Sequence, residues 1–233
     1  MTLAERHAAV MDRIAAAAVR ARRSPSEVRL IAVGKGQPLS AISAAAALGV
    51  TDFGENYARE LKLKAPGLPG VRWHFIGHLQ SNKVAEVVGA AAVVQSVDRP
   101  SLGVALDRRV ATLGAGHRLD VLVQVNVAGE QQKSGCHPHD APGLCCQLDQ
   151  LAGLRVCGLM SIPPHFDDPG QTRPLHASLR ALHARCREAL PVAAHDAFTE
   201  LSMGMSDDLE VAVEEGATMV RVGTALFGPR SLA

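Results

Sequence analysis

Lys35 stands directly after the apolar run 30–34 and is flanked by Gly34 and Gly36. A short apolar run of this kind is typical of a buried strand, which places the lysine at a strand end. There the lysine has two possible roles. Its ammonium can extend into solvent, or partial desolvation can lower the pKa of the amine, which then acts as a nucleophile and forms a Schiff base with a carbonyl. The two glycines leave space beside the amine for a bulky group. This segment alone leaves both interpretations open.

Two turns near the C-terminus, at 201–208 and 220–224, combine glycines with hydroxyl side chains. Backbone amides and hydroxyls in such turns bind phosphate. A structural alternative is that Ser206 only caps the next helix, whose first residues, Asp207 and Asp208, suit a helix start and would repel phosphate unless they point away. The residues of the two turns that are candidates for the phosphate site are Ser202, Gly204, Ser206, Gly223 and Thr224.

Arg221 lies inside the apolar segment 219–223, where an unpaired charge is costly. It therefore needs a partner, either a structural carboxylate such as Glu55 or an acceptor on a ligand. A Schiff-base lysine, phosphate-binding turns and a buried arginine are together the parts of a pyridoxal 5′-phosphate (PLP) site, where a protein side chain meets the pyridine nitrogen. Because arginine stays protonated, it would leave that nitrogen without a proton and make the ring a weak electron sink.

These residues need a scaffold, and apolar segments of strand length alternate with helical patterns along the chain. Most of the strand segments are continuous apolar runs, as in parallel strands covered on both faces. This alternation fits a closed (β/α)8 barrel or an open doubly wound sheet, and a count of eight strands favours the barrel. The predicted strands are 28–34, 51–54, 73–77, 93–97, 121–127, 156–162, 200–203 and 219–223. The predicted helices between them are 39–48, 82–88, 101–112, 138–151, 174–190 and 207–215.

Apolar residues at helical spacing in 3–18 predict an extra helix before the first strand. No Pro/Gly/Ser-rich linker divides the chain, so residues 1–233 are expected to form a single domain. Active sites of (β/α)8 barrels lie at the C-terminal ends of the strands, and phosphate is often held by the loops after strands seven and eight. Lys35 and both glycine–hydroxyl turns fall at these places.

The composition excludes several classes of function. With 24 basic and 23 acidic residues the net charge is +1, which gives no general field for nucleic acid or anionic membranes. No apolar run approaches the roughly 18 residues of a membrane span. Five cysteines without paired zinc-type spacing predict free thiols in a reducing, cytoplasmic compartment. Two weak metal patterns, Cys136 to His139 and His74 with His78, lack further ligands, so no metal is expected.

Seven segments resemble the YggS/PROSC family of PLP homeostasis proteins, in family order and across nearly the whole chain. The last of them is long enough to be highly specific. The resemblance implies a barrel of the alanine racemase N-terminal-domain type that binds PLP, takes part in intracellular PLP homeostasis, delivers PLP to apo-enzymes and has no established catalytic turnover. The segments are AVGK (32–35), FGENY (53–57), WHFIGHLQSNK (73–83), SVD (96–98), NVAGEQQKSG (126–135), GLMSIPP (158–164) and LSMGMSDDLEVAVEEGATMVRVGTALFG (201–228).

The resemblance also implies roles for single residues. Lys35 becomes the Schiff-base lysine, and Arg221 faces the pyridine nitrogen. The chain departs from the usual pattern beside the lysine, where Gly34 replaces a serine and Gln37 a second lysine. The remaining cofactor-binding residues that the resemblance implies are Asn56, His74, Met160 and Ser161 along the pocket, and Ser202, Gly204, Ser206, Gly223 and Thr224 in the phosphate-binding segments.

Two enzyme activities remain as alternatives. A PLP-dependent racemase needs a second base on the opposite face of the cofactor, commonly a tyrosine from another domain or subunit, and Tyr57 is the only tyrosine here. A phosphosugar aldolase would use the same lysine and phosphate turns without a cofactor. The lack of a spare tyrosine and of a second domain favours a monomeric PLP carrier over a racemase.

Overall fold

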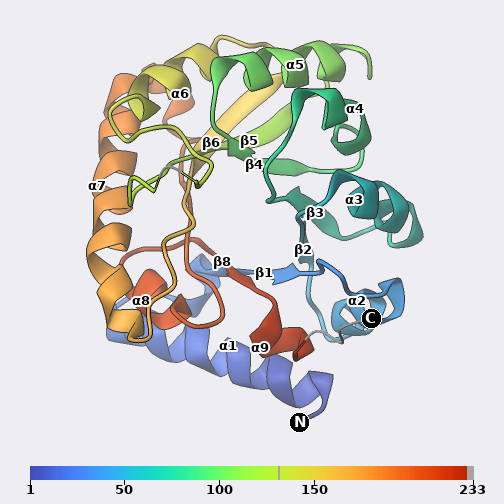
Figure 1. The fold of residues 1–233 in the computed structure, drawn as a ribbon, viewed down its shortest axis with the longest axis vertical. Coiled ribbons are helices and arrows are strands. Elements are labelled where there is room, and N and C mark those ends of the chain that lie inside the picture. Colours follow the sequence, from blue (N-terminus) through green and yellow to red (C-terminus); the bar gives the residue numbers. More distant parts are fainter. Residues whose placement is uncertain (131, 230–233) are drawn as a thin grey trace.

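The computed structural model describes residues 1–130 and 132–229. Within them, eight parallel strands close into a barrel in which consecutive strands pair and β8 pairs with β1 (Figure 1). The predicted (β/α)8 barrel is confirmed, and closure excludes the open doubly wound sheet. The strands are β1 (Arg29–Val33), β2 (Asp52–Glu55), β3 (Arg72–Phe75), β4 (Val93–Val97), β5 (Leu119–Gln124), β6 (Leu154–Met160), β7 (Glu200–Ser202) and β8 (Met219–Val222).

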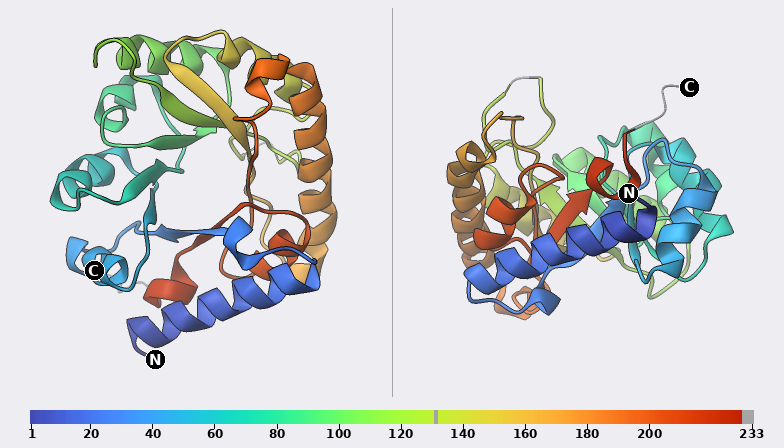
Figure 2. Two further views of the ribbon diagram at one scale, coloured as in Figure 1. Left: turned by 180° about the vertical axis from the view of Figure 1, so that it is seen from behind. Right: turned by 90° about the horizontal axis from the view of Figure 1, so that it is seen from below.

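Helices surround the barrel (Figures 1 and 2). The predicted N-terminal helix is confirmed, and every predicted helix between strands is found, although the one expected at 82–88 begins as a 3-10 turn. Helices α3 and α9 were not predicted. None of the helices in the described ranges has the length and hydropathy that crossing a bilayer requires. The helices are α1 (Leu3–Arg20), α2 (Leu39–Ala47), α3 (Ala58–Lys64), α4 (Val84–Val87), α5 (Pro100–Ala111), α6 (Ala141–Asp149), α7 (Arg173–Ala189), α8 (Leu209–Glu214) and α9 (Thr224–Phe227).

The strands carry apolar side chains toward the helices and several polar ones into the barrel. Phe53 and Leu159 belong to the large apolar cluster between strands and helices. Gln95 on β4 accepts a hydrogen bond from Ser202 on β7 at 2.7 Å, and both side chains are fully buried. Because this bond joins strands that are not neighbours, it crosses the barrel interior. The interior is thus partly polar, which requires that its polar groups satisfy one another.

Helix α1 braces the C-terminal elements from outside the barrel, running along α8 and α9 (Figures 1 and 2). Arg13 forms an ion pair with Glu210 of α8 at 2.6 Å and donates to the carbonyl of Ser206 at 2.9 Å. Arg6 donates to the carbonyl of Leu226 in α9 at 2.7 Å. The extra helix therefore holds the loop after β7 and the helix after β8, which are the two turns singled out in the sequence.

Gly204 is required by the turn after β7. Its φ of +88° is a left-handed conformation, and a Cβ there would lie 2.4 Å from the Cβ of Ala212. We expect Gly204→Ala to lower the free energy of unfolding by about 2–5 kcal/mol, because backbone strain and overpacking add. Gly143→Ala in α6 is the matched control, because its Cβ meets nothing within 4 Å, and it should be neutral or stabilise by up to about 1 kcal/mol. Urea unfolding measures both, and equal effects would contradict this account of Gly204.

Candidate functional site

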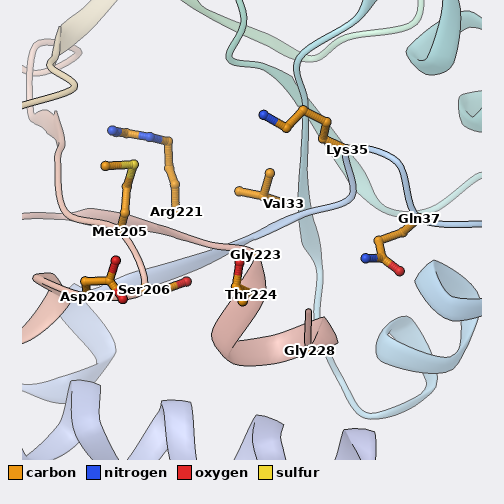
Figure 3. A pocket seen from close by; sticks show the side chains of 10 residues that line it. All are labelled: Val33, Lys35, Gln37, Met205, Ser206, Asp207, Arg221, Gly223, Thr224 and Gly228. Atoms are coloured by element: carbon orange, nitrogen blue, oxygen red, sulfur yellow. The ribbon is translucent and has the colours of Figure 1, made fainter. Parts of the chain in front are cut away.

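A cavity of about 220 Å³ opens at the C-terminal ends of β1 and β8, beside the loop that follows β7 (Figure 3). This is the end of the barrel where the sequence placed the site. Five of the predicted residues line the cavity, which brings the lysine, the arginine and parts of both turns together. The lining residues are Val33, Lys35, Gln37, Met205, Ser206, Asp207, Arg221, Gly223, Thr224 and Gly228.

Lys35 and Arg221 lie on opposite sides of this cavity. Figure 3 shows the Lys35 amine directed from the end of β1 toward the side where Arg221 rises from β8. Lys35 is half-buried, whereas Arg221 is only 3% exposed. A small molecule in the cavity would thus have a primary amine on one side and a fixed cation on the other.

Arg221 is held by two short hydrogen bonds. Its Nη1 donates to Ser202 Oγ and its Nη2 to the carbonyl of Ser161, each at 2.7 Å. Burial lowers the pKa of Arg221 to about 10, and the carboxylate of Asp208 opposes this shift. The guanidinium therefore stays charged at neutral pH. Glu55, suggested as its structural partner, is wrong for this role, because Glu55 pairs with Lys64 of α3 instead.

The loop that carries Lys35 is anchored from behind by Lys64. The Lys64 Nζ donates to the carbonyl of Gly34 at 2.9 Å, to Glu55 Oε1 at 2.8 Å and to Glu60 Oε2 at 2.6 Å. Glu60 Oε2 also accepts from the backbone N–H of Gly36 at 3.0 Å. The backbone on both sides of Lys35 is therefore tied to α3, which fixes the position from which the Lys35 side chain extends.

Glu55 is fully buried in this cluster, and desolvation raises its pKa to about 7, although the hydrogen bond from Lys64 acts in the opposite direction. Its Oε1 comes within 2.8 Å of the position that a Cβ on residue 34 would occupy, and Ile42 Cδ1 within 2.9 Å. A Cβ at position 34 would therefore require the ends of the Glu55 and Ile42 side chains to shift.

The opposite side of the cavity is formed by the two glycine–hydroxyl turns. Ser206 Oγ accepts a hydrogen bond from the N–H of Ala225 at 3.3 Å, so the loop after β7 touches the start of α9. Asp208 points away from the cavity: it is 5% exposed and pairs with His176 at 2.9 Å. Asp207 lines the cavity, but its side chain is 71% exposed to solvent. Of the two acids expected to repel a phosphate, only the solvated carboxylate of Asp207 therefore remains beside Ser206 and Thr224.

Six of the predicted residues do not line this cavity. His74 and Ser202 are fully buried in the barrel interior. Met160 and Ser161 lie at the end of β6, where the Ser161 carbonyl accepts from Arg221. Asn56 lines a neighbouring cavity of about 290 Å³. Gly204 shapes the turn without reaching the opening. The sequence analysis did not predict the other lining residues as cofactor-binding, and each of them lies within four positions of a predicted one: Val33, Gln37, Met205, Asp207 and Gly228.

The weaker metal patterns are not assembled into a site. Cys136 and His139 line a separate cavity of about 550 Å³, and His78 faces Ser134 rather than His74. No cluster of three or more potential metal ligands occurs in ranges 1–130 and 132–229. The five cysteines are unpaired.

Comparison with known proteins agrees with the barrel and with the motifs. The family model described as the N-terminal domain of alanine racemase matches residues 9–231. The pyridoxal phosphate homeostasis protein of Pseudomonas aeruginosa is 46% identical over 232 residues, covering 98% of this chain and 96% of that protein. The structure of PipY from Synechococcus elongatus with PLP bound has a TM-score of 0.80 and 37% identity, covering 97% of this chain and 100% of that one.

A more distant structure, alanine racemase from Corynebacterium glutamicum, shares the fold, with a TM-score of 0.68 at 17% identity over 94% of this chain and 62% of that one. A closed barrel with a lysine at the end of its first strand and glycine–hydroxyl turns after its last two is thus a domain of the alanine racemase N-terminal class. Within that class, the chain belongs to the YggS/PROSC family of pyridoxal phosphate homeostasis proteins. The resemblance seen in its motifs is confirmed.

Proposed function

We propose that this chain binds PLP in the cavity at the mouth of the barrel, holds it as a Schiff base on Lys35 and takes part in intracellular PLP homeostasis by delivering it to apo-enzymes. The observation that carries the proposal is the arrangement of Lys35 and Arg221 on facing sides of one cavity flanked by hydroxyl-bearing turns. The PLP-bound structure of PipY, 37% identical to this chain, supports it.

The residues of the cavity suit each part of the cofactor. PLP supplies an aldehyde for the Lys35 amine and a pyridine ring that withdraws electrons. Arg221, charged and fixed, would donate a hydrogen bond to the ring nitrogen, which keeps that nitrogen unprotonated and weakens electron withdrawal. The buried Oγ of Ser161 has no partner within the described ranges, which leaves it available to a ligand beside Arg221.

The phosphate is assigned to Ser206, Gly223 and Thr224, because these residues line the cavity on the side away from Lys35. We expect the double variant Ser206→Ala with Thr224→Val to weaken PLP binding at least about 10- to 100-fold, which is the effect of losing even one hydrogen bond to a charged group at about 1.5–3 kcal/mol. Binding of pyridoxal, which lacks the phosphate, should change less than about twofold. Equal losses for the two ligands in a titration would contradict this assignment.

A racemase remains the alternative activity. Tyr57 is 58% exposed and lines the neighbouring cavity with Asn56, so the only tyrosine of the chain is not placed as a second base beside Lys35. This supports a carrier. Incubation of the PLP-loaded protein with L-alanine, followed by chiral chromatography, separates the two functions: steady formation of D-alanine would establish a racemase.

The absorbance spectrum of the purified protein, with and without added PLP, tests the proposed function itself. A Schiff-base band supports it, whereas a colourless protein that traps a phosphosugar on borohydride reduction would indicate an aldolase. We further propose that the carrier acts as a monomer in the cytoplasm, a compartment that suits its five free cysteines.

A further inference from the structure

A continuous chain of hydrogen bonds crosses the barrel interior and ends on Arg221. Ser202 Oγ accepts from Arg221 Nη1 at 2.7 Å and donates to Gln95 Oε1 at 2.7 Å. Gln95 Nε2 contacts His74 Nδ1 at 2.9 Å, and His74 Nε2 contacts Asp52 Oδ1 at 2.8 Å. The five side chains come from β8, β7, β4, β3 and β2, and each is at most 5% exposed.

The chain has a definite direction. The amide nitrogen of Gln95 is a donor only, so His74 Nδ1 must accept and His74 Nε2 must carry the proton that is donated to Asp52. Every N–H or O–H in the chain then points away from Arg221 and toward the Asp52 carboxylate. The other oxygen of Asp52 accepts from the Thr51 hydroxyl at 2.7 Å, which completes the acceptor end. Burial lowers the pKa of His74, consistent with a neutral ring.

Two of the five N–H donors of Arg221 are thus used by Ser202 and Ser161, and the guanidinium plane is fixed by both. Ser202 has no proton left to donate to a phosphate, because its single hydroxyl proton goes to Gln95 Oε1 while its oxygen accepts from Arg221. Gln95 contacts Ser202 inside the barrel and does not line the cavity. A hydrogen bond from Arg221 to a ligand therefore depends on residues that do not touch the ligand.

We propose that Ser202 and Gln95 are positioning residues for Arg221, which aim its guanidinium at the pyridine nitrogen of PLP and make no contact with the cofactor themselves. The proposal rests on the proposed function and deepens it. It reassigns Ser202, which the sequence analysis placed among the phosphate-binding residues, to the side of the site that faces the ring nitrogen. A chain of hydrogen bonds that only fills the barrel interior would leave ligand affinity unchanged when it is broken. Affinity for two ligands therefore distinguishes a positioning role from a purely structural one.

The test compares Ser202→Ala and Gln95→Met with Ser96→Ala, using PLP and pyridoxal as probes. Ser96 is the matched control, because it is a fully buried serine on β4 whose Oγ has no partner within the described ranges. We expect Ser202→Ala and Gln95→Met to raise the Kd about tenfold, by the same factor for both ligands, since the pyridine nitrogen is common to them. Ser96→Ala should change either Kd less than about twofold.

Each other outcome has a distinct meaning. If Ser202→Ala weakens PLP but not pyridoxal, Ser202 contacts the phosphate and the proposal is wrong. If both variants match Ser96→Ala, the chain of hydrogen bonds only fills the interior, and the proposal is again wrong. If the wild-type protein binds neither ligand, the proposed function itself fails, and the positioning role falls with it.

A ligand-free measurement on the wild-type protein covers the case in which Ser202→Ala or Gln95→Met does not fold. Nitrogen-15 NMR of the wild-type protein, with His74 assigned by the loss of its signals in His74→Phe, reports which ring nitrogen carries the proton. We expect protonated Nε2 and unprotonated Nδ1 in the absence of PLP. A proton on Nδ1 would reverse the chain at Gln95, leave the Ser202 hydroxyl without its acceptor and overturn the proposal.

Discussion

Replacing Lys35 with alanine is expected to abolish the Schiff-base absorbance of the PLP-loaded protein completely. Lys35 is the amine that lines the cavity opposite Arg221, and alanine cannot form the covalent bond. PLP would then be held only by its phosphate and ring contacts, so its Kd should rise more than about tenfold, which corresponds to more than about 1.4 kcal/mol. Titration followed by absorbance and by equilibrium dialysis measures the band and the affinity separately.

Lys62→Ala is the control for this experiment, because Lys62 is an exposed lysine on α3. It should keep both the band and the affinity of the wild-type protein. A Schiff-base band that survives in Lys35→Ala at full intensity would show that a different amine holds the cofactor and would remove the basis of the assignment.

Replacing Lys64 with methionine is expected to lower the free energy of unfolding by about 3–5 kcal/mol. The substitution removes the cation 2.8 Å from the fully buried Glu55, so the folded chain must either keep an unpaired charge there or bind a proton, and removing one partner of a buried pair carries a cost of this size. It also removes the donor to the Gly34 carbonyl beside Lys35. Urea unfolding at pH 7.5, above the pKa of about 7 that burial gives Glu55, measures the loss.

Two further variants test the cause. Lys83→Met breaks a solvent-exposed pair with Glu86, whose nitrogen and oxygen are 2.8 Å apart, and should change the unfolding free energy by less than about 1 kcal/mol. Adding Glu55→Gln to Lys64→Met removes the buried charge and should recover part of the loss. A double variant as unstable as Lys64→Met alone would contradict the role given to the charge of Glu55.

Glu55 also predicts a pH dependence. Its pKa is about 7 in the folded protein, against 4.5 for an ordinary glutamate, so between these values the folded state keeps a proton that the unfolded chain has lost. Stability from this group is full below pH 4.5 and is lost as pH rises through 7, by roughly 3 kcal/mol in total at about 1.4 kcal/mol per pKa unit. His183 has the opposite effect, because burial lowers its pKa from 6.5 to about 4, so its contribution to stability is lost as pH falls below 6.5.

Because these two groups oppose each other, the informative quantity is the difference in unfolding free energy between wild type and Glu55→Gln. As pH rises from 4.5 to 7.5, wild type should lose roughly 3 kcal/mol relative to the variant. A difference that is constant across this range would show that Glu55 does not titrate there.

The strands and most helices could be predicted from sequence because buried parallel strands leave continuous apolar runs and amphipathic helices leave a periodic stripe. Helix α3 leaves neither. Of its two leucines only Leu61 is buried, while Leu63 is 70% exposed, so the apolar pattern gives no stripe. Helix α9 spans only four residues, which is too short for any periodicity.

The position of a candidate residue at the cavity was predictable where a motif falls at or next to the C-terminal end of a strand, as with Lys35, Arg221 and Thr224. It was not predictable where the outcome depends on which side of a strand a residue faces. Glu55 faces the helices and meets Lys64 nine positions later, and Ser202 faces the interior below Arg221. Partners of this kind are set by barrel closure, which brings β4 and β7 together across the interior.

The most direct test of the central claim is to find the amino acid that carries the cofactor. Wild-type protein loaded with PLP is reduced with borohydride, digested with trypsin and analysed by mass spectrometry. A label on Lys35 blocks cleavage there, so we predict a single modified peptide spanning residues 30–59. A label on another lysine, or efficient cleavage after Lys35 in fully labelled protein, would contradict the assignment of Lys35 as the residue that holds PLP.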